Sequence, residues 1–220
     1  MRSVLIRWEN DMLQQLFRLT VFLVLLVLAQ PASGFQPEDL TRLINSKQCR
    51  RCDLLQAQLS EIELNNADLK MVILSDADLS WSKLNHADLE DAVLENTNFS
   101  WSQLKSANLK RAYLKNANLQ LADLEAADLQ SAYLDQANLS WCNLREAHLK
   151  SASLSKANLH KTNLQEANLE RANLKDANLQ KANLSGANIE HAFFEGANLS
   201  SAIWINGRPC KNGSVGRCVQ

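Results

Sequence analysis

The chain has 220 residues, a formal net charge of −1 and a hydrophobic content of 46%. A charge this close to zero excludes the strong electric field that binding to nucleic acid or to an anionic membrane uses. Six glycines and three prolines are few for an ordinary all-β protein, and none of them lies between residues 38 and 185.

Residues 1–34 have the pattern of a secretory signal peptide. An apolar run at residues 19–29 follows Arg2, Arg7 and Arg18, and Ala32-Ser33-Gly34 offers small residues for cleavage before Phe35. The run is too short to cross the roughly 30 Å core of a bilayer as a helix, whereas the apolar region of a signal peptide has this length. We therefore expect the chain to be exported.

Two alternatives stay open for this leader. It can remain uncleaved as a membrane anchor, and the true start can be Met12 instead of Met1, because Met12 to Gly34 makes a compact signal peptide. Either start sends the rest of the chain across a membrane. No membrane contact is expected once the leader is removed.

Residues 35–50 do not follow the pattern of the stretch after them and are predicted to form an N-terminal capping helix. Pro37, Glu38 and Asp39 suit the first turn of a helix. The expected apolar face consists of Leu40, Leu43 and Ile44. The alternative function for this segment is an amphipathic helix that binds a partner.

Residues 51–204 repeat a five-residue unit without insertion. A large apolar residue, nearly always Leu, stands at every fifth position from Leu54 to Trp204, which gives 31 positions. Two places before it lies a small residue, usually Ala, with Asp or Asn between the two. A period of five fits neither a helix nor a plain alternating strand, so the stretch indicates a repeat architecture.

Each triplet such as Ala-Asn-Leu is predicted to be extended, with Ala and Leu on the inner side and Asn on the outer side. The other two residues of the unit then turn the chain, and the resulting coils stack at about 4.8 Å. Residue types recur every twenty positions, which indicates twenty residues per coil. The recurring sets are Trp81, Trp101, Leu121 and Trp141; Ile73, Val93, Tyr113 and Tyr133; and the alternating charges Lys70, Glu90 and Lys110 and Glu95, Lys115 and Asp135.

This pattern resembles that of the pentapeptide-repeat family, A(D/N)LXX, over about 150 residues. The resemblance implies an all-β fold, a right-handed quadrilateral β-helix with four pentapeptides per coil and about eight coils. It is specific for the fold and says little about function, because members of such a family share the rod and differ in what they bind.

The cysteines are Cys49, Cys52, Cys142, Cys210 and Cys218. Cys49 and Cys52 lie beside the predicted capping helix; a disulfide between them is one possibility, and their redox state is left open. A zinc site that joins the two end pairs is excluded, because about eight coils at about 4.8 Å separate them by roughly 35 to 40 Å. Cys142 occupies an inward small position and is expected to be a buried free thiol.

Residues 205–220 are predicted to form a C-terminal cap closed by a Cys210–Cys218 disulfide. The tail holds three Gly and one Pro and has too little apolar content to fold alone, so a disulfide in an oxidising compartment is the natural interpretation. Its endings Trp-x-x-Gly-x-x-Cys and Gly-x-Cys resemble those of exported pentapeptide-repeat proteins of cyanobacteria. That resemblance implies the thylakoid lumen or the periplasm.

No motif points to catalysis. His86, His148, His160 and His191 lack metal-ligand spacing, and the sequence holds no GxSxG, P-loop or GxGxxG. Stacked carboxylates such as Asp68 and Asp88 are expected to point outward from a rod that has no pocket to desolvate them. We therefore expect no enzyme, no catalytic residue, no metal and no cofactor.

Two hypotheses for the function remain. The first is an exported, monomeric scaffold that binds or organises an unidentified protein partner through its faces. The second comes from the resemblance, since some cytosolic family members imitate duplex DNA and protect gyrase from quinolones. Such a mimic needs dense negative charge, whereas the chain after Gly34 has 20 basic and 22 acidic residues.

The candidate partner-binding stripe comprises the aromatic and apolar residues that recur outside the core: Trp81, Trp101, Leu121, Trp141, Tyr113 and Tyr133. The tryptophans occupy one of the two variable positions of the unit, so they should climb the rod with their faces partly in water. Two interpretations stay open: the stripe is an interface, or stacked aromatics only stabilise the ladder.

Overall fold

The structure is a computed structural model that describes residues 36–220. The predicted leader, residues 1–34, lies outside the described residues. The first element of the described residues is α2, Pro37–Ser46, which begins with Pro and carries Glu38 and Asp39 in its first turn. It ends where Lys47 adopts a left-handed conformation and its N–H donates to the carbonyl of Leu43 at 2.9 Å. Within the described residues, no helix is long and apolar enough to span a membrane.

Helix α2 is tied to the first coil by its own side chains. Leu43 is fully buried, and the Asp39 carboxylate accepts the backbone N–H of Asp53 at 2.7 Å. A disulfide joins Cys49 to Cys52 directly after the helix. The contact with Asp53 pairs a backbone N–H at the open end of the repeat that would otherwise face water.

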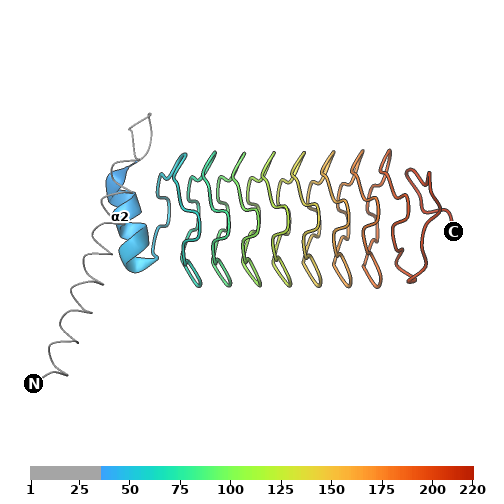
Figure 1. The fold of residues 1–220 in the computed structure, drawn as a ribbon, viewed down its shortest axis with the longest axis horizontal. Coiled ribbons are helices and arrows are strands. Elements are labelled where there is room, and N and C mark those ends of the chain that lie inside the picture. The colour runs from blue at the N-terminus through green and yellow to red at the C-terminus, as the bar shows by residue number, and fades with distance from the viewer. Residues whose placement is uncertain (1–35) are drawn as a thin grey trace, which may run out of the picture. The chain divides into compact units, whose positions relative to one another are not determined.

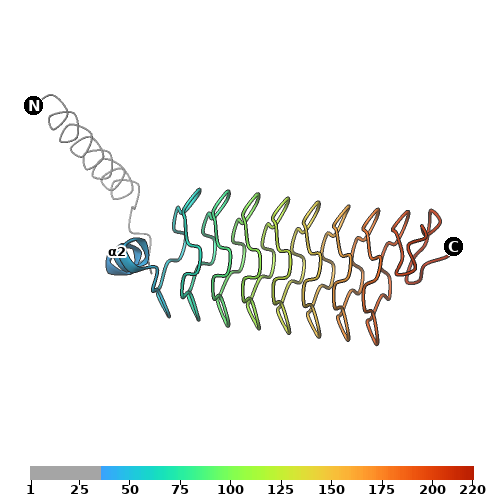
Figure 2. The same cartoon turned by 90° about the horizontal axis from the view of Figure 1, so that it is seen from below.

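The repeat forms a stack of coils whose neighbours pair in parallel. Bridges join residues twenty apart, from Gln48 with Asp68 to Asn183 with Ile203. Around each bridge the backbone bonds are short; for example, the N–H of Leu74 donates to the carbonyl of Val93 at 2.8 Å. Each bridge is isolated because only the triplet of each unit is extended. Figures 1 and 2 show the coils side by side along one axis, so the fold is a repeat β-helix.

The two residues after each Leu form a tight turn. The N–H of Ala57 donates to the carbonyl of Leu54 at 3.1 Å, and the same bond recurs along the chain. The second turn residue has a positive φ along the whole repeat, for example 59° both at Arg51 near its start and at Ser201 near its end. Gly186 and Gly196 occupy the same position. A positive φ at this position is that of a type II turn.

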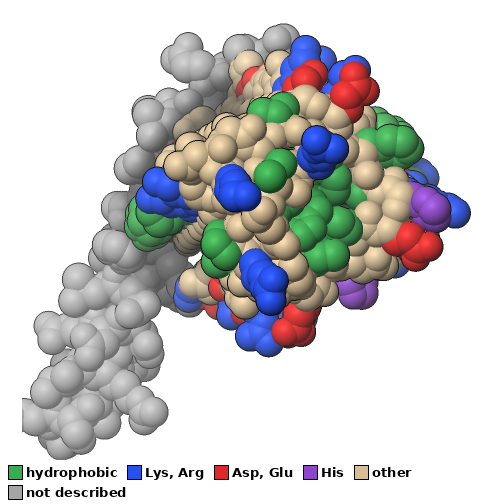
Figure 3. Space-filling view, turned by 90° about the vertical axis from the view of Figure 1, so that its right-hand side faces the viewer, with side chains coloured by type: hydrophobic (Ala, Val, Ile, Leu, Met, Phe, Trp, Pro, Cys, Tyr) green, Lys and Arg blue, Asp and Glu red, His purple; other side chains and the backbone are tan. Residues whose placement is uncertain are grey.

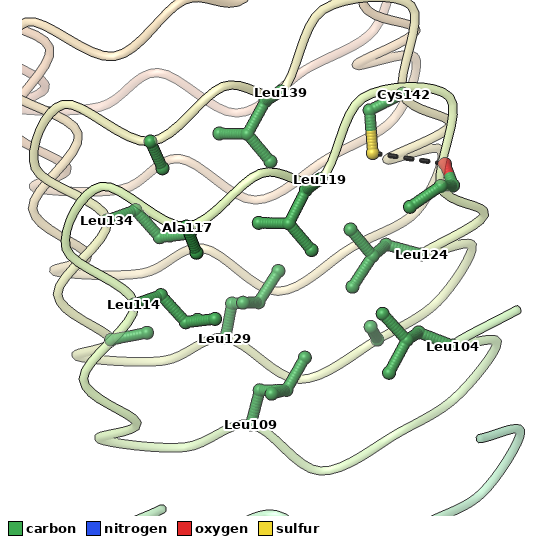
Figure 4. Packing of buried hydrophobic residues seen from close by; sticks show 14 of the residues in the cluster. Leu104, Leu109, Leu114, Ala117, Leu119, Leu124, Leu129, Leu134, Leu139 and Cys142 are labelled. Atoms are coloured by element: carbon green, nitrogen blue, oxygen red, sulfur yellow. Dashed lines mark hydrogen bonds between the residues drawn. The ribbon is translucent and has the colours of Figure 1, made fainter. Parts of the chain in front are cut away.

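The interior of the coils is a column of Leu flanked by columns of small residues. Nearly every Leu and Ala of the triplets is buried, from Leu54 to Ala202. Figure 4 shows leucines of successive coils, such as Leu104 and Leu124, stacked one above the other and pointing into the interior. The inward orientation predicted for these two positions agrees with this burial. Buried hydroxyls are paired as well; Thr162, for example, donates to the carbonyl of Leu139 at 2.6 Å.

The C-terminal tail runs back against the last coil. Asn198 bridges Val215 and Ile203 bridges Pro209, both antiparallel. The disulfide between Cys210 and Cys218 holds the tail closed, with Cα atoms 5.2 Å apart. Figure 3 looks onto this end, where hydrophobic side chains lie among Lys and Arg. The tail therefore covers the backbone edge that the last coil leaves open.

Candidate interaction surface

The structure places the predicted tryptophans in one column at a turn of the coil. Trp81, Trp101, Leu121 and Trp141 all occupy the second turn residue, with φ between 60° and 62°. The indoles of Trp81, Trp101 and Trp141 are 55%, 46% and 50% exposed. We call these four residues the tryptophan column. Its side chains are directed outward by the left-handed backbone rather than by an extended strand.

The aromatic contacts within the column differ along its length. Trp81 and Trp101 stack with ring centroids 4.8 Å apart and planes 2° apart. Leu121 separates this pair from Trp141, whose ring has the ammonium of Lys161 above it, 3.8 Å from the centroid. His160 meets the same ring edge-on at 6.5 Å. The column is thus a continuous apolar ridge that ends in a cation.

Tyr113 and Tyr133 do not belong to that column. They occupy the middle of their triplets, bridge each other in parallel and stack at 5.0 Å. Tyr113 lies eight residues before Leu121 along a coil of twenty, so it is nearly as far around the coil as a residue can be. The six residues predicted as one stripe therefore form two separate surfaces.

A third surface is polar and uniform. The amides of Asn98, Asn118, Asn138, Asn158 and Asn178 each donate to the side chain twenty residues earlier, at 2.9 to 3.2 Å. Their own side-chain oxygens also accept backbone N–H groups two residues on, as Asn118 does from Gln120 at 3.2 Å. Because this ladder satisfies its own hydrogen bonds, it offers few unpaired groups to a ligand.

The charged side chains pair along the stack, although not always with the predicted partner. Lys70 contacts Glu90 at 2.9 Å, at the predicted spacing of twenty. Lys110 contacts Asp128 at 3.0 Å instead of Glu90, because the guanidinium of Arg111 already binds Glu90. Lys70 and, to a smaller extent, Arg111 lower the pKa of Glu90 to about 2.

The described residues offer little to catalysis. Cys142 is buried, and its thiol donates to the carbonyl of Ala122 at 3.1 Å (Figure 4). Burial raises the pKa of this thiol far above its ordinary value, which keeps it protonated and inert. Within residues 36–220, no three His, Cys, Asp or Glu side chains come together as metal ligands would.

A β-helix of five-residue units with inward Leu and Ala defines a class of repeat protein, and sequence comparison identifies which one. The family model for pentapeptide repeats matches in 8 copies, over residues 73–111, 107–145, 132–171, 142–180 and 177–203. These matches span more than half of the chain, so the protein belongs to the pentapeptide-repeat family. No curated protein sequence matches the chain.

Several solved structures of pentapeptide-repeat proteins are similar to the chain, among them the following three. Trypsin-treated QnrB1, a plasmid-mediated fluoroquinolone resistance protein, is 25% identical over 68% of this chain and 72% of its own, with a TM-score of 0.53. HetL, involved in heterocyst differentiation regulation in the cyanobacterium Nostoc sp. strain PCC 7120, is 27% identical over 80% and 99%, with a TM-score of 0.35. A pentapeptide repeat protein of the Arabidopsis thaliana thylakoid lumen is 23% identical over 60% and 79%, with a TM-score of 0.19.

Proposed function

We propose that this protein is an exported, non-enzymatic repeat scaffold that binds a protein partner through the tryptophan column. The observation that carries the proposal is the half-exposure of three indoles in one column. A Trp side chain offers up to roughly 150 to 250 Å² of contact area. With half of that in water, three of them and Leu121 approach the few hundred Å² at which an exposed apolar patch marks an interaction site.

The proposal includes the finer architecture. Bridges at a spacing of twenty residues, with a unit of five, support four pentapeptides per coil. Together with family membership they support a right-handed quadrilateral β-helix of about eight coils over residues 51–204. Residues 35–50 and 205–220 serve as its N-terminal and C-terminal caps.

Export rests on the leader and on the disulfides. Residues 1–34 carry the pattern of a signal peptide, and the two cysteine pairs at the ends of the repeat are bonded. Disulfides persist in oxidising compartments. These features support the thylakoid lumen or the periplasm, and mass spectrometry of the protein from its host should then find Phe35 as the first residue.

Trp101→Ser is the variant that tests partner binding. The chain already places Ser201 at the same position of its coil with φ 59°, so the backbone accepts this residue. Lys181→Ser, in the same column beyond the apolar stretch, is the matched control. We expect a partner cross-linked in the native compartment to be lost from Trp101→Ser and retained by Lys181→Ser. Equal capture by both variants would remove the tryptophan column from the function.

A second candidate, a gyrase-binding mimic of DNA, is favoured by the similarity to QnrB1. The balance of 20 basic and 22 acidic residues after Gly34 argues against it, because a mimic needs net negative charge along its length. A supercoiling assay separates the two. Inhibition of gyrase at sub-micromolar protein concentration would favour the mimic, and no inhibition is expected.

A further inference from the structure

One side of the β-helix is apolar where the other three are polar. The middle residue of the triplet is Asp, Asn, Glu, Gln, Lys or His on the other sides in the coils that hold residues 73–133. On this side it is Ile73, Val93, Tyr113 and Tyr133, which bridge one another in that order. We call these four residues the tyrosine face. Ile73, Tyr113 and Tyr133 are 37%, 44% and 46% exposed, and Val93 is partly buried.

Two charged residues flank the centre of the tyrosine face. Glu95 follows Val93 by two positions, and Lys115 follows Tyr113 by two positions in the next coil. Both side chains are exposed. Neither has an ion-pair partner among residues 36–220, where Glu90 and Lys110 do. A second pair of opposite charges, Asp91 and Arg111, lies on the other flank in the same two coils.

These positions are self-complementary about a two-fold axis between the coils of Val93 and Tyr113. An antiparallel second copy would set Val93 against the partner's Tyr113, and Ile73 against the partner's Tyr133. The same operation sets each Glu95 against a Lys115 and each Asp91 against an Arg111. A parallel copy would exchange the flanks and instead place Glu95 against the partner's Asp91 and Lys115 against the partner's Arg111, which like-charge repulsion disfavours.

We propose that the tyrosine face is the interface of an antiparallel homodimer in which Glu95 of each copy pairs with the partner's Lys115. Such an interface is isologous, as two-fold symmetry requires. It has an apolar centre and a charged rim, the usual anatomy of a protein interface. This surface is distinct from the tryptophan column, which stays free for an unlike partner, so the dimer does not depend on the function proposed above.

The size of the face sets the expected strength of the dimer. Four coils at about 4.8 Å give a contact roughly 20 Å long. The side is only one extended triplet wide, about 10 Å, so even with its flanks the face buries less than the about 800 Å² per partner that stable interfaces bury. We therefore expect a dimer that dissociates on dilution, visible by analytical ultracentrifugation of the protein purified from its host.

Charge reversal tests the register. Glu95→Lys and Lys115→Glu should each raise the dissociation constant of the dimer at least tenfold. Each variant sets like charges against one another, and two-fold symmetry repeats this contact twice in the dimer. The double variant exchanges the two charges and should restore the dimer. Glu195→Lys is the matched control: it sets a Lys beside Lys175 in the same column, three coils beyond the face, and should leave the dissociation constant unchanged.

The apolar centre is tested by Tyr113→Ser, a residue that the chain itself carries two coils on at Ser153 in the same column. It should abolish the dimer, whereas Phe193→Ser, in the same column but outside the face and 63% exposed, should not. A cooperative thermal unfolding transition in each variant is the control that it is folded. A wild-type protein that stays monomeric at all concentrations, dimers that survive both single reversals, or a double variant that stays monomeric would each overturn the proposal. So would occupation of the face by another protein or by the leader.

Discussion

The indole rings of Trp81 and Trp101 lie parallel, 4.8 Å between centroids, although twenty residues separate them in the chain. This distance is about the spacing of paired strands, so the stack follows directly from the register of the coils. Stacked aromatic pairs contribute about 0.5 to 1.5 kcal/mol beyond their buried area. The contact thus reports on the stacking of coils at the surface, independently of the core.

A double-mutant cycle measures this contact. We expect Trp81→Ser and Trp101→Ser to show a coupling of about 0.5 to 1.5 kcal/mol in the free energy of unfolding. The cycle of Trp81→Ser with Trp141→Ser is the control, because Trp101 and Leu121 separate those two rings, and its coupling should be near zero. Chemical denaturation gives both values. Equal coupling in the two cycles would mean that the rings do not stack in solution.

The inward Leu column should dominate stability. Leu124 is fully buried in a central coil, so Leu124→Ala should lower the free energy of unfolding by about 2 to 5 kcal/mol, since it removes apolar contacts and leaves a cavity. Leu121→Ala, only three residues away but on the outer turn, should cost about 0.5 kcal/mol or less. Urea unfolding of the two variants decides the point; comparable losses would contradict the inward and outward assignment.

The repeat could be predicted from the sequence because its inward positions tolerate little else. Leu54 to Trp204 keep one register without insertion, and the spacing of Trp81 from Trp101 already gives twenty residues per coil. Alternation within the triplet then gives the buried side. The two-surface arrangement could also have been found, because Tyr113 and Trp101 differ in their position within the unit.

The turn conformation and the ion pairs were harder to predict. The left-handed φ of Trp101 has no signal in its own side chain; the hints come from Gly186 and Gly196 and from Asn and Asp residues, such as Asn96, at the same position of other units. Lys110 was predicted to pair with Glu90 at a spacing of twenty, yet it contacts Asp128. Long charged side chains reach several neighbours across a flat ladder, so spacing alone does not choose among them.

Glu90 should make stability depend on pH. Its pKa in the folded state is lowered from 4.5 to about 2, mainly by Lys70 and then by Arg111. A lowered pKa means that the stabilisation is present above about 4.5 and is lost as the pH falls from there toward about 2. At neutral pH we expect wild type to have a higher melting temperature than Glu90→Gln. This difference in melting temperature should disappear as the pH falls from about 4.5 to about 2.

The ordering of the two cations supplies the control. The gap in melting temperature between wild type and Glu90→Gln should shrink more in a Lys70→Met background than in an Arg111→Met background, because Lys70 is the larger cause of the lowered pKa. If the difference in melting temperature between wild type and Glu90→Gln stays constant down to about pH 2, the ion pairs of Glu90 do not form.

The Cys210–Cys218 disulfide should stabilise the C-terminal end of the stack rather than the whole. It closes a short loop, which stabilises the folded state by about 2 to 3 kcal/mol. The tail pairs with the last coil through the N–H of Cys210, which donates to the carbonyl of Ala202 at 2.8 Å. A solenoid frays from its ends, because each coil contacts only its neighbours.

In Cys210→Ala/Cys218→Ala, hydrogen exchange at the backbone amide of residue 210 should therefore accelerate by roughly 30- to 150-fold. The amide of Leu124, which donates to Asn143 at 2.8 Å in a central coil, should be nearly unaffected. Uniform acceleration at both amides would mean that the stack unfolds as one unit and that the cap holds all of it.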